Sequence, residues 1–248
     1  MKITPIRTHK IEAQDTDLLT ILDQYLPVVI PENSIVAITS KIVSICEGRL
    51  LPINSVDKNE LIKQEADFYL PRSMSKYNFL LTIKYGLLIP SAGIDESNSN
   101  GFYVLWPSNP QKSANLIREH LGKTRNLKNL GIVITDSRSM PLRWGVTGAG
   151  LSYSGFSALN DLRGTHDIFG RELKVTQVNV MDAIASAAVF EMGEGSEQTP
   201  LAIVSDLKNV DFQNRNPTYE ELNALHIEID DDLYAPLLKS VNWKKGES

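Results

Sequence analysis

The chain has 248 residues, of which 42% are hydrophobic and 22% are charged, and its formal net charge is −5. This composition predicts a globular protein with a sizeable core, and the absence of a basic stripe argues against a nucleic-acid partner. No apolar run approaches the roughly 18 residues of a membrane span, and a single cysteine, Cys46, suits a reducing compartment. We therefore expect a cytoplasmic protein without a nucleic-acid or membrane partner.

The first half of the chain mixes strand and helix patterns. Apolar, β-branched runs bounded by turn formers predict strands, and leucine-isoleucine spacing near one helical turn predicts helices. We expect a strand at 3–8, a helix at 16–26, a buried strand that begins the stretch 34–45, a helix at 57–69, two strands that meet at Tyr85-Gly86 within 78–90, and a strand at 101–107.

The second half begins with an amphipathic helix at 110–121, with Leu116, Ile117 and Leu121 on one face. Residues 145–155 carry four glycines and are expected to be loop or closely packed backbone. The remaining expectations are a buried strand at 129–137, a strand at 171–177, a helix that begins the stretch 178–195, a strand at 199–207 and an acidic helical tail. Strands and helices do not alternate regularly, so the pattern favours an α+β fold over a doubly wound sheet.

Several familiar motifs are absent or incomplete. The Gly122-Lys123-Thr124 tripeptide lacks the earlier glycine of a phosphate-binding loop, where Ile117 stands, and it follows a helix instead of a strand. Gly122 is better explained as the cap that ends this helix. The four histidines are scattered, which disfavours a structural zinc site, and Ser154 lacks the glycine of a nucleophile elbow.

Three acids stand where apolar segments end. Asp95 follows Ser-Ala-Gly-Ile, Asp136 ends a buried strand, and Glu194 lies between two glycines after a helix. Each acid alone is typical of a cap or a turn. If the acids converge, however, they must share a cation or a proton.

Three arginines lie near glycines in the second half of the chain. Singly, each is typical of a surface ion pair. Together with divalent ions they would suit an anionic, phosphate-bearing ligand, and we treat them as candidate catalytic residues. They are Arg143, Arg163 and Arg171.

Seven motifs occur in a characteristic order between residues 35 and 205. They are TSKIVSICEGR (39–49), SAGIDESN (91–98), PSNPQKSANLIREHL (107–121), GIVITDS (131–137), LRWGVTG (142–148), DLRGTHDIFGRELKVT (161–176) and MGEG (192–195). This ordered set resembles the coenzyme F420-0:L-glutamate ligase (F420 gamma-glutamyl ligase) family. The order and spacing of the motifs are far more specific than any one of them.

The resemblance implies a two-lobed α+β fold with mixed or antiparallel sheets, in which residues 1–248 form one unit of two intertwined lobes. It implies a homodimer whose subunits together form the site. The implied reaction is a GTP-dependent amide bond between a carboxylate acceptor and L-glutamate or a similar amino acid, through an acyl phosphate. The implied cofactors are two divalent ions, Mg or Mn, and a monovalent ion such as K.

The resemblance also implies roles for individual residues. Asp95 and Asp136 match the acids that hold one metal, while Ser137 and Glu194 match the groups that help to hold a second. The positions that match contacts to the nucleotide are Thr39, Ser40, Asn98, Met192, Gly193, Gly195 and Ser196.

The sequence departs from the family pattern around the nucleotide. Ile45 replaces a family lysine, and Lys41, four residues earlier, would face the same side of a strand. The segment 9–12 is the counterpart of an apolar family segment, and Trp144 replaces an arginine. These changes indicate a divergent member, in which the acceptor is F420-0 or another carboxylate and the nucleotide is GTP or ATP. An inactive nucleotide-binding paralogue and a metal-dependent phosphohydrolase are the alternative functions.

Overall fold

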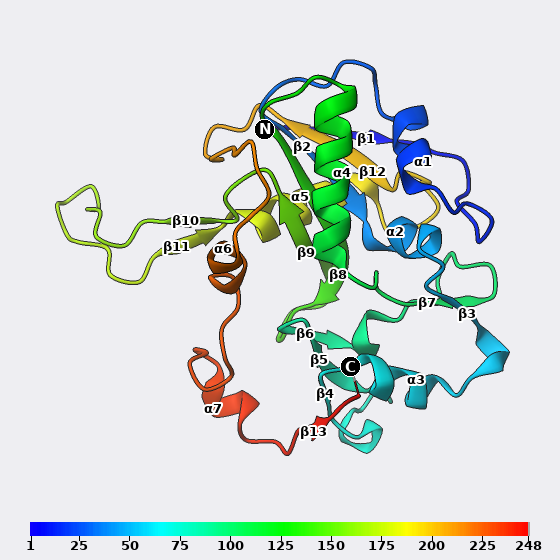
Figure 1. Ribbon diagram of the computed structural model, residues 1–248. Coiled ribbons are helices and arrows are strands. Elements are labelled where there is room, and N and C mark those ends of the chain that lie inside the picture. The colour runs from blue at the N-terminus through cyan, green and yellow to red at the C-terminus, as the bar shows by residue number, and fades with distance from the viewer. Residues whose placement is uncertain (248) are drawn as a thin grey trace.

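A five-stranded mixed sheet forms the centre of the larger of two lobes (Figure 1). The structure is a computed structural model and describes residues 1–247. The strand order is β1 (Lys2–Ile6), β12 (Leu201–Ser205), β2 (Ser34–Thr39), β8 (Leu130–Ser139) and β9 (Val146–Ser154). Strands β2 and β8 are parallel, and the other neighbours are antiparallel. This mixed sheet confirms the α+β prediction.

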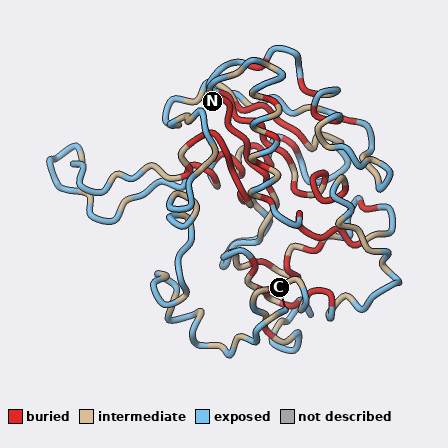
Figure 2. The backbone as a smooth tube through the Cα atoms, viewed as in Figure 1, coloured by how far each residue is buried: buried red, intermediate tan, exposed pale blue. Residues whose placement is uncertain are grey.

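Helices cover both faces of this sheet, as expected from a strand pattern that is apolar on both sides. Val36 and Ile38 of β2 belong to one buried cluster, and Ile35 and Ala37 belong to another, because successive side chains point to opposite faces. Figure 2 shows the buried backbone concentrated in these strands. The first face is covered by α1 (Leu18–Tyr25), α2 (Ser40–Cys46) and α4 (Pro110–Thr124), and the second by α5 (Val180–Met192).

Residues 49–105 build the smaller lobe, which has its own apolar core. Its strands are β3 (Leu50–Pro52), β4 (Phe68–Tyr69), β5 (Leu81–Lys84), β6 (Leu87–Pro90) and β7 (Phe102–Val104), joined by β13 (Lys244–Lys245) from the chain end. Its helices are α3 (Lys58–Glu65) and three short 3₁₀ turns, η1 (Ile53–Ser55), η2 (Arg72–Met74) and η3 (Ser91–Gly93). No helix within residues 1–247 is long and apolar enough to cross a membrane.

An arm of residues 159–179 projects from the larger lobe, on the left of Figure 1. Its base is the two-stranded pair of β10 (Leu159–Asp161) and β11 (Gln177–Asn179). Its tip exposes Ile168 (92%) and Phe169 (89%) to solvent. After β12 the chain runs down to the smaller lobe through two short helices, α6 (Tyr219–Asn223) and α7 (Ala235–Leu238).

The glycine-rich stretch 145–155 is a strand, so the loop alternative is wrong and the close-packing alternative is confirmed. A Cβ on Gly148 would lie 2.4 Å from the Ala185 carbonyl oxygen, and one on Gly150 would lie 2.5 Å from Met181. The absence of side chains therefore lets α5 approach β9 closely.

Other boundary predictions need correction. The strand that begins at 34 ends at Thr39, where α2 starts. The helix expected at 110–121 runs on to Thr124 and contains Gly122 in its last turn, so Gly122 is not its cap. Leu116 is 50% exposed, while Ala114, Ile117 and Leu121 form the buried face.

The 171–177 stretch is a strand only at Gln177, because the arm that contains it packs against no sheet. The tail is mostly irregular, with only the short α6 and α7 as helices. In the 57–69 stretch, the helix ends at Glu65 and a short strand follows. The strand at the N-terminus, the hairpin around Tyr85-Gly86, and the cores of α1, α4, α5, β8 and β12 are confirmed.

Candidate active site

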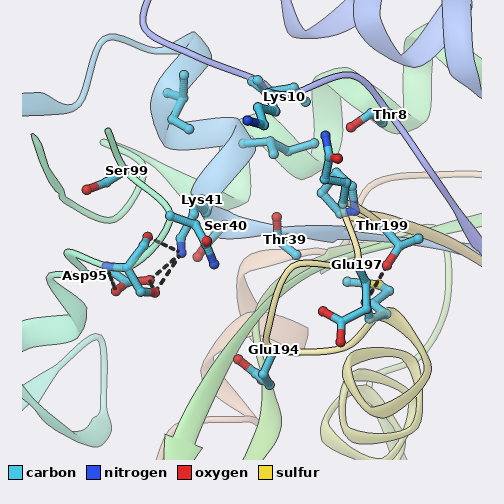
Figure 3. Close-up of a pocket in the computed structure, with 18 of the residues that line it drawn as sticks. Thr8, Lys10, Thr39, Ser40, Lys41, Asp95, Ser99, Glu194, Glu197 and Thr199 are labelled. Atoms are coloured by element: carbon cyan, nitrogen blue, oxygen red, sulfur yellow. Dashed lines mark hydrogen bonds and ion pairs between the residues drawn. The ribbon is translucent and has the colours of Figure 1, made fainter. Parts of the chain in front are cut away.

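A cavity of about 820 Å³ opens at one edge of the large sheet, between the two lobes (Figure 3). Its wall is made by five segments that are distant in sequence. They are residues 8–14, 39–45, 95–102, 135–137 and 189–200.

The parallel pairing of β2 and β8 explains why two of these segments meet. Thr39, the last residue of β2, is paired in register with Thr135 of β8, and β8 continues to Ser139. Ser40-Lys41 at the start of α2 and Asp136-Ser137 within β8 therefore lie at the same sheet edge. A register shift between Ile134 and Thr135 in the pairing with β9 lies just before Asp136. Such irregularities often re-aim a side chain beside an active site.

Asp95 reaches the cavity from the smaller lobe. Its backbone forms two hydrogen bonds with Val104, at 3.0 and 2.9 Å, immediately after the turn η3. Gly93 in this turn has φ of +72°, and a Cβ there would lie 2.2 Å from the Trp106 indole. Glycine is required here both by the left-handed backbone and by the packed tryptophan.

Among the acids of the cavity, Asp136 has the pKa that is shifted furthest from its ordinary value. Its Oδ1 accepts a 2.8 Å hydrogen bond from the Ser137 N–H, and its Oδ2 accepts one from the Trp106 indole N–H. Burial raises the pKa of Asp136 to about 7, and the negative charge of Asp95 adds to this effect. Trp106 is 2% exposed and stacks on Tyr85 with ring centroids 6.0 Å apart. The indole therefore holds the carboxyl in a defined orientation.

The pKa of Asp95 is shifted in the opposite direction from that of Asp136. Burial alone would raise its pKa, but the Lys41 ammonium, 2.5 Å from Oδ2, and the Ser97 N–H and hydroxyl hold the pKa below its ordinary value. Burial raises the pKa of Glu194, Asp95 adds to the rise, and Lys41 opposes it. The charge of Asp95 thus acts on both of the other acids of the cavity.

The donor set suits a hard divalent cation. Asp95, Asp136, Glu194 and Ser137 all line the cavity and offer only oxygen atoms, which Mg²⁺ and Mn²⁺ prefer. Over residues 1–247, however, no three His, Cys, Asp or Glu side chains converge as a ready ligand set. In Figure 3 Lys41 is bonded to Asp95, while Glu194 lies apart on the opposite segment.

All seven residues expected to contact a nucleotide line the same cavity. Thr39 and Ser40 join β2 to α2, and Asn98 donates a 3.0 Å hydrogen bond from Nδ2 to the Gly195 carbonyl oxygen. Gly193 ends α5 with φ of +81°, which turns the chain back over the opening. The bond from Asn98 ties the smaller lobe to this glycine segment.

The three candidate arginines lie outside this cavity. Arg143 is exposed in the turn between β8 and β9. Arg163 pairs with Asp161 at 2.5 Å, and Arg171 is exposed near the tip of the arm. The chain thus brings together the expected metal and nucleotide residues but not the arginines.

The structure adds two residues to the site that the motif comparison did not select. Trp106 binds Asp136 through its indole, and Lys41 binds Asp95. The sequence did indicate that Lys41 and Ile45, four residues apart, face the same side. The reason is a helix and not a strand, because residues 40–46 form α2, in which positions four apart share a face. Ile45 also lines the cavity, as do residues 9–12. The thiol of Cys46, the single cysteine of the chain, is unsuited to nucleophilic chemistry, because burial raises its pKa to about 12.

Known sequences agree with this arrangement. A sequence profile of the family described as F420-0:Gamma-glutamyl ligase matches residues 5–206. The chain is 30% identical over 227 residues to the coenzyme F420:L-glutamate ligase of Methanopyrus kandleri, covering 84% of this chain and 88% of the relative. The relative of the same name from Halorubrum lacusprofundi is 31% identical over 229 residues, with the same two shares. That from Methanocaldococcus jannaschii is 41% identical over 138 residues, which is 55% of each chain. The chain belongs to the F420-0:gamma-glutamyl ligase family and is a ligase of that kind.

Proposed function

We propose that this ligase joins the amine of L-glutamate to a carboxylate of F420-0, with GTP as phosphate donor and Mg²⁺ or Mn²⁺ as cofactor. The observation that carries the proposal is the cavity itself, which gathers four oxygen-bearing side chains and seven nucleotide-contact candidates from distant segments. The names of the relatives supply the substrates.

In this proposal Asp95 and Asp136 hold one divalent ion, and Ser137 with Glu194 helps to hold a second. A monovalent ion such as K⁺ completes the cofactors. When bound, the ions would neutralise charge that develops on the phosphoryl oxygens during transfer. Thr39, Ser40, Asn98 and the segment 192–196 hold the nucleotide.

The bond changes balance in two steps. An oxygen of the acceptor carboxylate attacks the γ-phosphorus of GTP, the bond from this phosphorus to the bridging oxygen breaks, and GDP leaves. The glutamate nitrogen then attacks the acyl carbon, phosphate leaves with the bonding electron pair, and the nitrogen loses a proton to solvent or phosphate. The chain's part is to align the two carboxylate-bearing substrates with the nucleotide and to exclude water from the acyl phosphate.

We include a homodimer and one cooperative unit of two lobes in this proposal. The arm exposes Ile168, Phe169 and Val175, at 92, 89 and 85%, which a second copy would cover. Arg163 and Arg171 lie on the same arm, so the partner's cavity is the place where they would meet phosphate or substrate carboxylates. Sedimentation of the wild-type protein and of Phe169→Ser tests this part: a dimer that the substitution weakens is expected, and a wild-type monomer contradicts it.

Calorimetry with GTP and with ATP, each with and without Mn²⁺, is the first test. Metal-dependent binding that favours GTP is expected, followed by glutamate addition to F420-0 detected by mass spectrometry. Phosphate release that needs neither glutamate nor acceptor would identify a phosphohydrolase instead. Nucleotide binding without any turnover would identify an inactive paralogue.

A further inference from the structure

Lys41 occupies the acidic part of the cavity. It follows Thr39 and Ser40 at the junction of β2 and α2, and its side chain is 26% exposed. Its Nζ lies 2.5 Å from Asp95 Oδ2, 2.9 Å from the Ser97 carbonyl oxygen and 3.3 Å from the Ser97 hydroxyl. An ammonium has three N–H donors, and these three oxygens can accept all of them.

The same ammonium acts on all three acids of the cavity. It lowers the pKa of Asp95 through a hydrogen bond and charge, and it opposes the rise of the pKa of Asp136 and of Glu194 through charge. Lys41 is therefore the shared counter-charge of Asp95, Asp136 and Glu194.

A divalent ion on Asp95 would lie close to the positive charge of Lys41. Oxygen ligands of Mg²⁺ or Mn²⁺ lie about 2.1 Å from the metal, so an ammonium on the same carboxylate oxygen would lie only roughly 4 Å from the ion. Two like charges this close repel strongly in a partly buried site. Lys41 therefore opposes metal binding at Asp95, and its movement away from this carboxylate favours metal binding.

The long, flexible stem of lysine allows this movement. Lys41 lines the same cavity as the nucleotide-contact candidates and follows two of them directly. A triphosphate is the anion that would enter this cavity with the metal, and lysine binds phosphate as a compact point charge. The phosphate oxygens therefore give the displaced ammonium a new partner.

We propose that Lys41 holds Asp95 in the free enzyme and transfers to the nucleotide phosphates when the metal binds, so that it opposes metal binding until nucleotide is present. This inference rests on the proposed function and adds a positioning role that the family motif did not assign. Lys41 discriminates between the bare ion and the metal–nucleotide pair.

The test is a titration of Mn²⁺ followed by the loss of its free-ion paramagnetic resonance signal, without nucleotide. Lys41→Met keeps most of the length of the unbranched side chain and removes its charge. We expect Mn²⁺ alone to bind about tenfold more tightly to this variant, and GTP with Mn²⁺ to bind about tenfold more weakly. The two affinities move in opposite directions, which general damage to the site would not cause.

Two further variants complete the design. Lys41→Arg keeps the charge and should retain the weak binding of Mn²⁺ alone. Lys58→Met is the matched control, because Lys58 pairs with Glu96 beside the site but does not line the cavity. It should leave both affinities unchanged.

Unchanged or weaker binding of Mn²⁺ alone to folded Lys41→Met would overturn the role of Lys41. That result leaves the proposed function standing if the wild type still binds Mn²⁺ with GTP. Failure of the wild type to bind Mn²⁺ under any condition would instead overturn the proposed function, and the Lys41 inference with it.

Discussion

The cavity and the arm both carry charged residues of the family motifs, yet the two regions are built differently. Asp136 lies in β8, next to the buried residues that pair in parallel with β2, and is held by Ser137 and Trp106. Arg163 leaves a short surface hairpin and is held only by its near neighbour Asp161. The sheet and its neighbours within the same chain fix the position of Asp136. The side chains of the arm would be fixed in position only by a second molecule that packs on the arm. The contrast predicts large effects of cavity substitutions, and small effects of arm substitutions, on Mn²⁺ affinity and on the stability of the fold.

Asp136→Asn is expected to have the largest effect. Loss of this charged oxygen ligand should weaken Mn²⁺ binding more than about 100-fold, beyond the effect typical of an outer-shell residue. The fold should persist, because a neutral amide suits the enclosed position. Mn²⁺ titration and circular dichroism measure the two properties. Asp161→Asn on the arm is the control, and undiminished binding by Asp136→Asn would remove the metal assignment.

Glu65→Gln tests the support beneath the cavity. Glu65 binds Lys84 at 2.6 Å and Arg49 at 2.8 Å, and the Lys84 side chain is only 4% exposed. Burial lowers the pKa of Lys84 while Glu65 opposes this, so the variant leaves a buried ammonium without its carboxylate. We expect a loss of about 3–5 kcal/mol in the free energy of unfolding.

Urea denaturation measures this loss, with Glu172→Gln on the arm as control. Glu172 is exposed, and its substitution should not change the denaturation midpoint. Equal midpoints for the wild type and Glu65→Gln would show that the buried cluster contributes no stability.

Trp106→Phe tests the orientation of Asp136. The phenyl ring keeps much of the packing against Tyr85 and Gly93 but cannot donate to the carboxylate. Outer-shell partners of metal ligands typically contribute about 10–100-fold to affinity, so Mn²⁺ should bind more weakly by that factor. Trp144→Phe, at a position 91% exposed in the turn after β8, should leave Mn²⁺ binding unchanged. If both variants changed the affinity for Mn²⁺ equally, the hydrogen bond from Trp106 would not be what orients Asp136.

The dependence of stability and of Mn²⁺ affinity on pH is expected to be the smallest of these effects. The pKa of Asp136 is raised by burial from its ordinary 3.8 to about 7 in the metal-free fold. Because the folded state binds this proton more tightly than the unfolded state, the resulting stability is complete below 3.8 and is lost as the pH rises through 7. Mn²⁺ needs the deprotonated carboxylate, so its affinity should rise over the same range.

Thermal melting of the metal-free protein between about pH 5 and pH 8 measures this slope, which Asp136→Asn should flatten. Asp161→Asn should retain the slope, because the Arg163 hydrogen bond lowers the pKa of Asp161 away from this range. A wild-type melting temperature that rises steadily with pH would contradict the assignment.

The amino-acid sequence by itself determined the family, the α+β class, the main strands and helices, and the acids at the ends of segments. These features are local: an apolar run such as that of β8 and the acid that ends it lie within a few residues of each other, so periodicity and motif order reveal them. The boundaries that were wrong, such as the end of the 57–69 helix, which lies at Glu65, depend on packing as well as on propensity.

Only the tertiary structure decided how the site is assembled. Lys41 meets Ser97 across 56 residues of sequence, Trp106 meets Asp136 across 30, and Asn98 meets Gly195 across 97. No local pattern encodes such pairs, because they arise when the sheet edge, the smaller lobe and the end of α5 fold against one another. The glycines of β9 show the same limit: their spacing predicted either a loop or closely packed backbone, and only the position of α5 against them showed that this backbone is a closely packed strand.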